Sequence, residues 1–167
     1  LYSKLDLMQI VSELEESEHS DLDADEERIV HGALQFSHTS VREIMTPKER
    51  VTTYEKNQRI NQAFIDDVAE SAFSRYPVYS GNEDNIVGIL YSKDLLSEED
   101  NTVLSQTEDA FDENFLRVRP DEKLDVVLGR MLKQKKHMGI VLSKNKQFLG
   151  VVTLEGIIEG IIQFEIE

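Results

Sequence analysis

The spacing of apolar residues predicts two helices at the start of the chain. Within residues 3–16 the apolar positions recur three and four residues apart, so they share one face of a helix. These positions are Leu7, Ile10, Val11 and Leu14. A second helix is expected over residues 24–37, where Asp23 fits an N-cap and Glu26 would close a capping box.

The acidic segment between these helices also has the D-x-D-x-D spacing that opens a calcium-binding loop. Such a loop needs glycine at its sharp turn and a bidentate glutamate at its end. Glu26 and Gly32 stand at those two places instead. We therefore interpret the segment as a helix start.

From residue 40 onward the pattern changes to short strands and helices. Ser40 and Glu43 predict a capping box for a short helical turn that Pro47 ends, because proline disfavours helical geometry in the residue before it. The elements expected next are a strand at 51–54, a helix at 58–70, strands at 75–79 and 86–91, and a short helix opened by Ser92.

The same order of elements returns in the second half of the chain. The expected elements are a strand at 115–118, a helix begun by Pro120 and Asp121, strands at 138–142 and 148–153, and a helix at 154–164. Ile60 aligns with Leu124 at an offset of 64 residues, and Leu95 aligns with Ile157 at an offset of 62. One such unit buries too little apolar surface to stand alone, so we expect the two copies to pack face to face.

This repeat divides the chain into four segments. We expect a helical linker over residues 1–40, a first repeat over 41–100, an acidic linker over 101–114 and a second repeat over 115–167.

Composition narrows the classes of protein to consider. The 167 residues are 40% hydrophobic, which is ordinary for a folded protein, and the net charge of −15 argues against a nucleic-acid partner. The absence of cysteine excludes a disulfide scaffold and fits a reducing compartment. No apolar run approaches the ~20 residues needed to cross a bilayer. A start at Leu1 in place of Met suggests a fragment of a longer protein.

The sequence lacks the motifs of the common enzyme classes. It has no GxxxxGK[ST] loop, no GxGxxG after a strand, no HExxH and no GxSxG. The four histidines, His19, His31, His38 and His137, show no metal-ligand spacing. We therefore expect neither catalysis nor a metal site formed by protein ligands alone.

Several phrases, in order, resemble one family. GILYSKD at 88–94 and GVVTLEG at 150–156 hold equivalent places in the two halves. Together with VREIMTP at 41–47, SRYPVY at 74–79 and KKHMGIVL at 135–142, they resemble the paired cystathionine-β-synthase (CBS) domain, or Bateman module. The chain is most similar to the branch found in CorC/HlyC and CNNM magnesium and cobalt transport proteins. This resemblance implies an α+β fold in which two β-α-β-β-α repeats pack with pseudo-twofold symmetry after two linker helices.

The resemblance also implies a function. It predicts a regulatory module on the cytoplasmic side of the membrane that senses ATP or AMP, with Mg²⁺, and controls a linked membrane transport domain. The nucleotide-binding positions that it implies are Thr46, Phe73, Ser74, Arg75, Tyr76, Pro77 and Thr153. Guanidinium donors suit phosphate, hydroxyls suit polar contacts, and an aromatic face suits adenine.

Structural roles are the alternatives for these residues. Arg75 could form a surface ion pair, Thr153 could be the N-cap of the last helix, and Tyr76 could fill the core.

One position departs from the family pattern. Gly156 stands where the family has an aspartate that holds the ribose hydroxyls, so a charge-assisted acceptor is missing. Such a bond is worth ~1.5–3 kcal/mol, or roughly ten- to a hundredfold in affinity. A second candidate cleft keeps its carboxylate and comprises Tyr91, Asp94, His137 and Met138. The alternative hypothesis is a ligand-free interaction module that forms a homodimer through its CBS helices.

Overall fold

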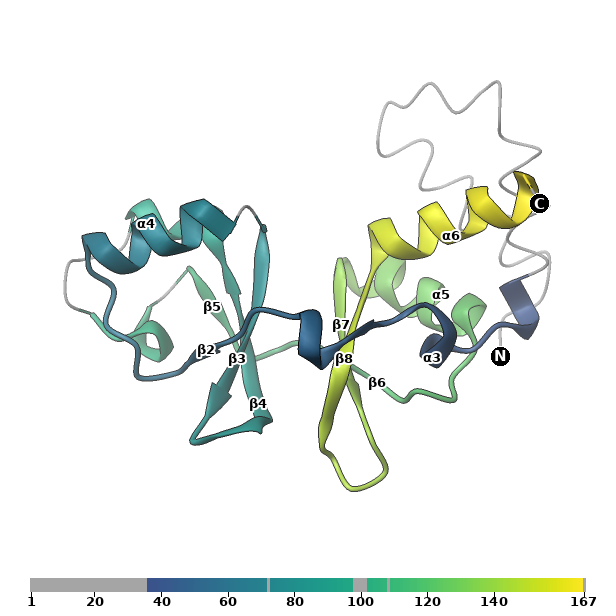
Figure 1. Ribbon diagram of the computed structural model, residues 1–167, viewed down its shortest axis with the longest axis horizontal. Coiled ribbons are helices and arrows are strands. Elements are labelled where there is room, and N and C mark those ends of the chain that lie inside the picture. Colours follow the sequence, from purple (N-terminus) through teal and green to yellow (C-terminus); the bar gives the residue numbers. More distant parts are fainter. Residues whose placement is uncertain (1–35, 72, 98–101, 108, 167) are drawn as a thin grey trace. The chain divides into compact units, whose positions relative to one another are not determined.

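The computed structural model describes residues 36–71, 73–97, 102–107 and 109–166 (Figure 1). The helices predicted over 3–16 and 24–37 lie outside this part of the chain, except for the last two residues of the second. There Phe36–His38 form a 3₁₀ helix. The described residues fall into two compact units. Unit 1 comprises 36–46, 116–141 and 151–166, and unit 2 comprises 47–115 and 142–150.

Unit 2 contains a four-stranded sheet in the order β2-β3-β4-β5. The strands are β2 (Tyr54–Glu55), β3 (Arg75–Ser80), β4 (Asn82–Tyr91) and β5 (Phe111–Asp112). β2 runs parallel to β3, and the β3–β4 and β4–β5 pairs are antiparallel. Gly81, with φ of +72°, makes the tight turn between β3 and β4, which is a backbone conformation that glycine adopts without strain. The predicted hairpin is therefore present, with a longer second strand.

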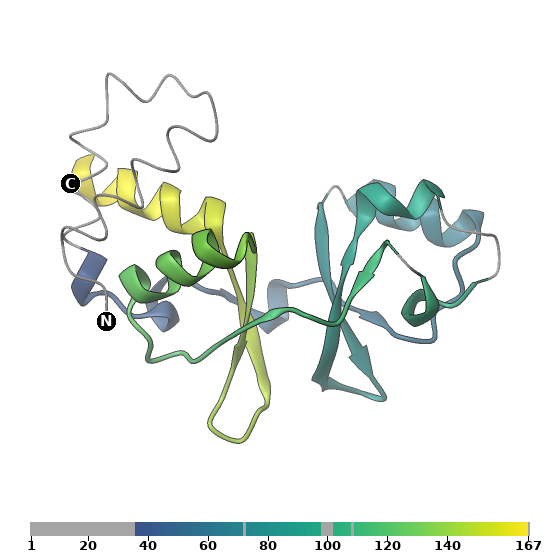
Figure 2. The ribbon, with the colours of Figure 1, turned by 180° about the vertical axis from the view of Figure 1, so that it is seen from behind.

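Helix α4 (Gln62–Ser71) lies beside the 3₁₀ helix Ser92–Ser97 in unit 2 (Figure 2). The prediction that α4 begins near residue 58 was wrong by four residues. The Asn61 side-chain oxygen accepts the Phe64 N–H at 2.9 Å, so Asn61 acts as the N-cap. The strand expected at 51–54 occurs only as the short β2.

The stretch predicted as an acidic linker contributes to the core of unit 2. Leu104 is fully buried in the 3₁₀ helix Leu104–Gln106, and Phe111 is buried in β5. A Cβ added at Gly88 would overlap the Phe111 ring, so the absence of a side chain at Gly88 lets this ring pack onto β4. The buried cluster consists of Ile60, Phe64, Val68, Tyr76, Val78, Leu90, Leu95, Leu104, Ala110 and Phe111.

A second four-stranded sheet has the order β1-β8-β7-β6, and most of its residues belong to unit 1, whereas residues 47, 142 and 148–150 belong to unit 2. The strands are β1 (Thr46–Pro47), β6 (Leu116–Val118), β7 (Met138–Leu142) and β8 (Phe148–Thr153), of which β7 and β8 have the predicted bounds. Helices α5 (Leu124–Gln134) and α6 (Leu154–Ile166) contact each other beside this sheet. The four apolar positions predicted to face inward from α5 are all buried: Leu124, Val127, Leu128 and Met131.

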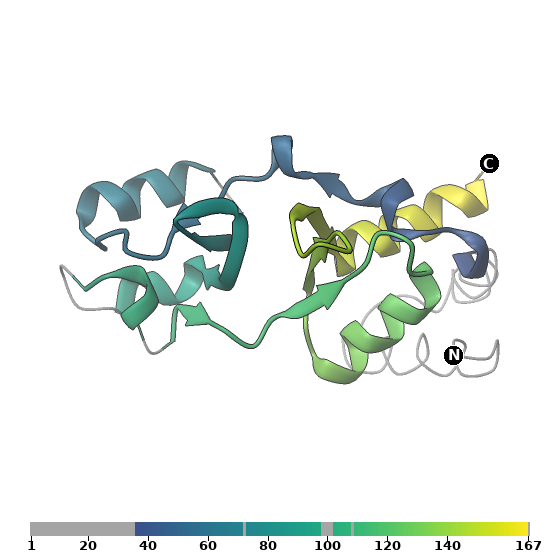
Figure 3. The same cartoon turned by 90° about the horizontal axis from the view of Figure 1, so that it is seen from below.

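The short helix α3 (Val41–Ile44) contacts α6 (Figure 3). Its predicted capping box is present, because the Ser40 N–H donates to the Glu43 carboxylate at 2.7 Å. Backbone bonds then join this segment to the lead-in of α5: Val41 N–H donates to the Glu122 carbonyl at 2.9 Å, and Leu124 N–H donates to the Thr39 carbonyl at 2.9 Å. Residues 39–44, at the start of the predicted first repeat, thus pack with the second repeat.

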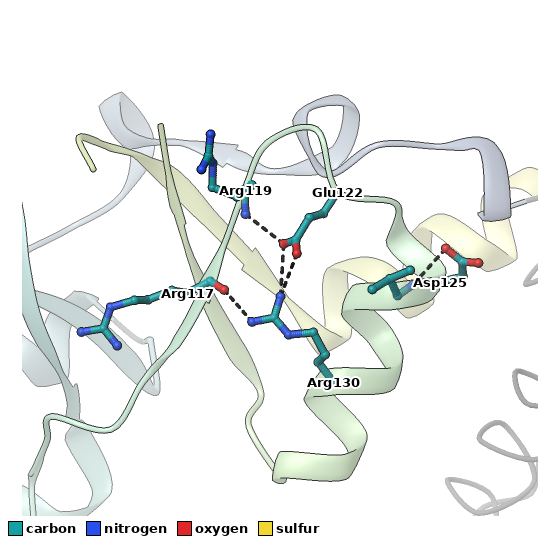
Figure 4. A network of polar contacts seen from close by, with 6 residues as sticks. Arg117, Arg119, Glu122, Asp125 and Arg130 are labelled. Atoms are coloured by element: carbon teal, nitrogen blue, oxygen red, sulfur yellow. Dashed lines mark hydrogen bonds and ion pairs between the residues drawn. The ribbon is translucent and has the colours of Figure 1, made fainter. Parts of the chain in front are cut away.

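A polar network fixes the connection between β6 and α5 (Figure 4). The Arg130 guanidinium donates to both Glu122 carboxylate oxygens, at 3.0 and 3.1 Å, and to the Arg117 carbonyl at 2.7 Å. Glu122 also accepts the Arg119 N–H at 2.9 Å. Because residues 119–122 are held in this turn, α5 begins at Leu124 rather than at the predicted Pro120 and Asp121.

Candidate functional site

The predicted nucleotide-binding segment Phe73–Pro77 lies in unit 2, where it leads into β3. Phe73 is 60% exposed and Ser74 is exposed, whereas Arg75 is half-buried. Tyr76 and Pro77 are buried. The segment therefore presents an aromatic residue and a serine to solvent, and it also carries a half-buried arginine.

Tyr76 supports this segment from inside unit 2. Its hydroxyl accepts the Phe73 N–H at 3.0 Å, donates to the Val68 carbonyl at 3.3 Å and lies 3.1 Å from the Ser71 hydroxyl. Its ring packs edge-on to Tyr54, with 5.2 Å between centroids. Of the two aromatic rings considered for adenine, only Phe73 has its ring exposed.

Tyr54 and Asp67 extend the same polar cluster. Burial raises the pKa of the Tyr54 phenol above its usual value, and the nearby Asp67 carboxylate adds to this shift. The phenol donates to Asp67 at 3.4 Å. Tyr54 is therefore neutral at physiological pH and can donate this hydrogen bond.

Arg75 and Tyr91 belong to two different predicted clefts, and the structure brings them together. They are directly opposite residues on β3 and β4. The guanidinium carbon of Arg75 lies 5.8 Å from the centroid of the Tyr91 ring, within the range of a cation–π contact. One residue from each predicted set thus lies at the same end of this hairpin.

Ser92 is a residue whose role the sequence did not reveal. Its N–H donates to the Ser74 carbonyl at 3.0 Å, and its hydroxyl donates to the Phe73 carbonyl at 3.1 Å and the Ser74 carbonyl at 3.3 Å. The sequence indicated only that Ser92 opens a short helix. The contact follows from the register that pairs Arg75 with Tyr91, which a single sequence does not provide.

The other two predicted nucleotide-binding residues, Thr46 and Thr153, lie on the neighbouring strands β1 and β8 of unit 1. Both are half-buried. The Thr153 hydroxyl oxygen accepts the Gly156 N–H at 3.0 Å, so Thr153 caps α6, which was the structural alternative for this residue. The hydroxyl proton of Thr153 still has the capacity to donate to another group.

Gly156 lies close to this capping hydroxyl. A Cβ added at Gly156 would lie 2.9 Å from the Thr153 oxygen, which is closer than a normal contact. Any side chain at this position would therefore require the Thr153 hydroxyl to move slightly.

The residues of the second predicted cleft also divide between the units. Asp94 is half-buried in the 3₁₀ helix that follows Tyr91 in unit 2. In unit 1, Met138 is buried, and His137 Nδ1 lies 3.4 Å from a Glu155 carboxylate oxygen. Because both predicted sets draw residues from both units, each set stays a prediction.

Within the described residues, no group of three or more histidine, aspartate or glutamate side chains is placed to hold a metal ion. Nor does any helix in that part of the chain have the length and apolar character needed to cross a membrane.

Comparisons with known proteins agree with this architecture. The CBS domain family matches residues 41–101 and 108–163. The magnesium and cobalt efflux protein CorC of Escherichia coli (strain K12) is 31% identical over 155 residues, which cover 92% of this chain and 53% of that protein. The chain spans about half the length of the curated relatives it matches.

Two solved structures are similar over most of their length. The CBS domain of the bacterial CNNM/CorC family Mg²⁺ transporter is 32% identical, with a TM-score of 0.72, and the alignment covers 97% of each chain. A CBS domain of that transporter family in complex with ATP is 35% identical, with a TM-score of 0.71, covering 83% of this chain and 97% of the other.

Proposed function

We propose that this chain binds an adenine nucleotide and regulates a linked transporter. The premise is that the chain belongs to the CBS domain family and is a tandem CBS module related to those of CNNM/CorC Mg²⁺ transporters. The CBS modules of CNNM/CorC transporters are non-enzymatic regulatory modules. The proposed ligand is ATP or AMP accompanied by Mg²⁺, and the proposed cargo of the parent transporter is magnesium or cobalt.

One observation carries this proposal. The Phe73–Arg75 segment offers an exposed ring, a serine hydroxyl and a guanidinium within three residues, in a chain 35% identical to a CBS domain solved with ATP. An aromatic face suits the base, and a planar guanidinium suits phosphate oxygens. The chain carries a net charge of −15, so bound Mg²⁺ would lower the repulsion between the phosphates and the protein.

The threonines of unit 1 complete the proposed set. The capping bond of Thr153 uses its hydroxyl oxygen as the acceptor, so we assign the hydroxyl proton as a donor to the nucleotide. Thr46 is assigned a second hydroxyl contact with the nucleotide. Pro77 and Tyr76 fix the backbone behind Phe73 rather than contact the base.

Calorimetry tests the proposal directly. ATP and AMP would be titrated, each with and without Mg²⁺, into the wild type, an Arg75→Ala variant and an Arg50→Ala control. Arg50 is an exposed arginine of unit 2, outside the predicted site. Arg75→Ala is expected to weaken ATP binding roughly ten- to a hundredfold, because it removes charge-assisted bonds. Undiminished heat with Arg75→Ala would contradict the site assignment.

Gly156 favours a second candidate function, a ligand-free homodimeric interaction module, because its lack of a carboxylate removes a ribose acceptor. Sedimentation and thermal melting separate the two candidates. A dimer at low concentration whose melting temperature no adenine nucleotide changes would support the interaction module. A nucleotide-dependent rise in melting temperature would support the regulatory module.

Regulation requires that the nucleotide bind one state of the parent protein more tightly than another. The proposed position of the module is the cytoplasmic side of the membrane, joined to the transport domain through residues 1–40. Ion flux by the full-length protein, measured with wild-type and Arg75→Ala modules at saturating and absent ATP, tests the coupling. Equal ATP dependence in both would contradict it.

A further inference from the structure

Two adjacent residues at the end of β4 hold the Phe73–Arg75 segment, and all of the contacts lie within unit 2. Ser92 binds the carbonyls of Phe73 and Ser74 through its N–H and its hydroxyl, over distances of 3.0 to 3.3 Å. Tyr91 places its ring 5.8 Å from the Arg75 guanidinium carbon.

We propose that Ser92 and Tyr91 are positioning residues for the nucleotide. Ser92 acts through the backbone that carries Phe73, and Tyr91 acts through the guanidinium of Arg75. This inference rests on the proposed function, and it adds two residues that the predicted nucleotide-binding set does not contain.

The Arg75–Tyr91 contact is compatible with phosphate binding. A guanidinium above a ring keeps its N–H donors in its own plane, directed outward, so they can still reach phosphate oxygens. A long arginine side chain loses rotamer freedom when it binds a ligand, and a ring that already restricts it lowers that cost. The Tyr91 ring therefore prepares Arg75 for binding.

The Ser92 contacts concern Phe73, the residue assigned to the adenine base. Phe73 and Ser74 precede β3, and Ser92 supplies hydrogen bonds to both of their carbonyls. The Tyr76 hydroxyl accepts the Phe73 N–H at 3.0 Å. The Phe73 backbone is thus held at its N–H and at its carbonyl, so the exposed ring is presented from a fixed position.

These two roles predict different ligand dependence. Tyr91 acts through the group assigned to phosphate, so its loss should weaken ATP binding and leave binding of adenosine unchanged. Ser92 acts through the ring assigned to the base, so its loss should weaken the binding of ATP and of adenosine by the same factor. A purely structural role of Tyr91 would instead weaken the binding of both ligands.

The first arm of the experiment is calorimetric titration of ATP with Mg²⁺, and of adenosine, into Tyr91→Leu. Tyr91→Phe is the matched control because it keeps the ring. Tyr91→Leu is expected to bind ATP about two- to fivefold more weakly, the effect of losing a weak cation–π contact, and Tyr91→Phe is expected to bind ATP as the wild type does. In an Arg75→Ala background, Tyr91→Leu should cause no further loss.

The second arm uses Ser92→Ala, with Ser80→Ala at the other end of β3 as the control. Ser92→Ala is expected to weaken the binding of both ligands equally, by up to about tenfold, and Ser80→Ala is expected to change the binding of neither. Hydrogen exchange of the wild type supplies a measurement that does not depend on a variant folding. The Ser92 amide, bonded to Ser74, should exchange slowly, and fast exchange would overturn the Ser92 role.

The outcomes separate this inference from the proposed function. If the wild type binds ATP and Arg75→Ala weakens it, but Tyr91→Leu binds ATP as well as or better than the wild type, the Tyr91 role is overturned and the proposed function stands. Unequal losses for the two ligands with Ser92→Ala would overturn the Ser92 role alone. A wild type that binds neither ATP nor adenosine overturns both the inference and the proposed function.

Discussion

The two repeats form the same hairpin, but the side chains at its end differ between them. In unit 2 the three aligned positions at the end of the hairpin are Arg75, Tyr91 and Asp94, and in unit 1 they are Met138, Thr153 and Gly156. The first set provides a cation on an aromatic ring and a carboxylate. The second set provides a buried methionine, a capping hydroxyl and no side chain. The hairpin itself tolerates either set, so these positions are free to specify a ligand.

The segments that follow the two hairpins also differ. Thr153 caps α6, which runs for 13 residues. Tyr91 occupies the equivalent position in unit 2, where it has no short hydroxyl for capping, and Ser92 directs its hydroxyl back to Phe73 and Ser74. The segment after Tyr91 is a six-residue 3₁₀ helix. A cap in one unit is thus replaced in the other by a contact that holds the predicted site.

The largest expected effect distinguishes the cores of the two units. Phe111→Ala should lower the free energy of unfolding by about 3–5 kcal/mol, because it opens a cavity over Gly88 in unit 2. Denaturant titration measures the loss, and hydrogen exchange should show it in unit 2. Phe73→Ala is the control, because Phe73 is 60% exposed and the loss of its ring should change stability little. Equal losses for both variants would contradict the assignment of Phe111 to the core.

Gly156→Asp makes the end of the unit 1 hairpin resemble that of unit 2. Under the proposed function the added carboxylate should tighten nucleotide binding roughly ten- to a hundredfold, because it supplies a charge-assisted acceptor for the ribose. Calorimetry with ATP and Mg²⁺ measures the change, and Gly156→Ala separates the carboxylate from the crowding of Thr153. Binding of Gly156→Asp no tighter than that of Gly156→Ala would show that the missing aspartate is not what limits affinity.

Thr153→Ala removes the cap that distinguishes α6 from the 3₁₀ helix of unit 2. The expected loss is about 1 kcal/mol of stability, the usual cost of deleting an N-cap hydroxyl. Thr153→Ser keeps the hydroxyl and should retain most of that stability. Thermal or denaturant unfolding of the three proteins provides the test, and a serine variant as unstable as the alanine variant would argue against capping.

The smallest effect concerns Tyr54, which aligns with Val118 of unit 1. Because the folded state raises the pKa of Tyr54, the unfolded chain loses its phenolic proton at a lower pH than the folded chain. The contribution of Tyr54 to stability is therefore present below pH 10 and declines as the pH rises through the folded pKa. Tyr54→Phe should make the fall in stability above pH 10 less steep, and identical alkaline profiles for the two proteins would contradict this.

The sequence predicted the fold well where apolar runs or apolar periodicity are clear. The bounds of β7 and β8 follow from short continuous apolar runs, and the inward face of α5 follows from helical spacing. Helix starts were harder to predict. Asn61 caps α4, so this helix begins four residues later than expected. Helix α5 also begins later than expected, after a turn held by the contact between Glu122 and Arg130, which are eight residues apart in sequence.

The candidate site was less predictable than the fold. The sequence identified Phe73, Ser74 and Arg75 as one segment, but Tyr76 supports that segment from the core through three polar neighbours. Ser92 could not be identified because its partners, 18 and 19 residues away, depend on strand register. The meeting of Arg75 with Tyr91 depends on the same register.

The pairing of residues 39–46 with the second repeat bears on how this chain can be divided. A cut at residue 114 would leave α3 and β1 on one fragment and the sheet that β1 completes on the other. The fragment 115–167 would then expose an edge of β8 that β1 normally covers, and unpaired strand edges favour aggregation. Two such fragments expressed together would have a specific means of reassembly, since each holds a piece of unit 1 that the other lacks.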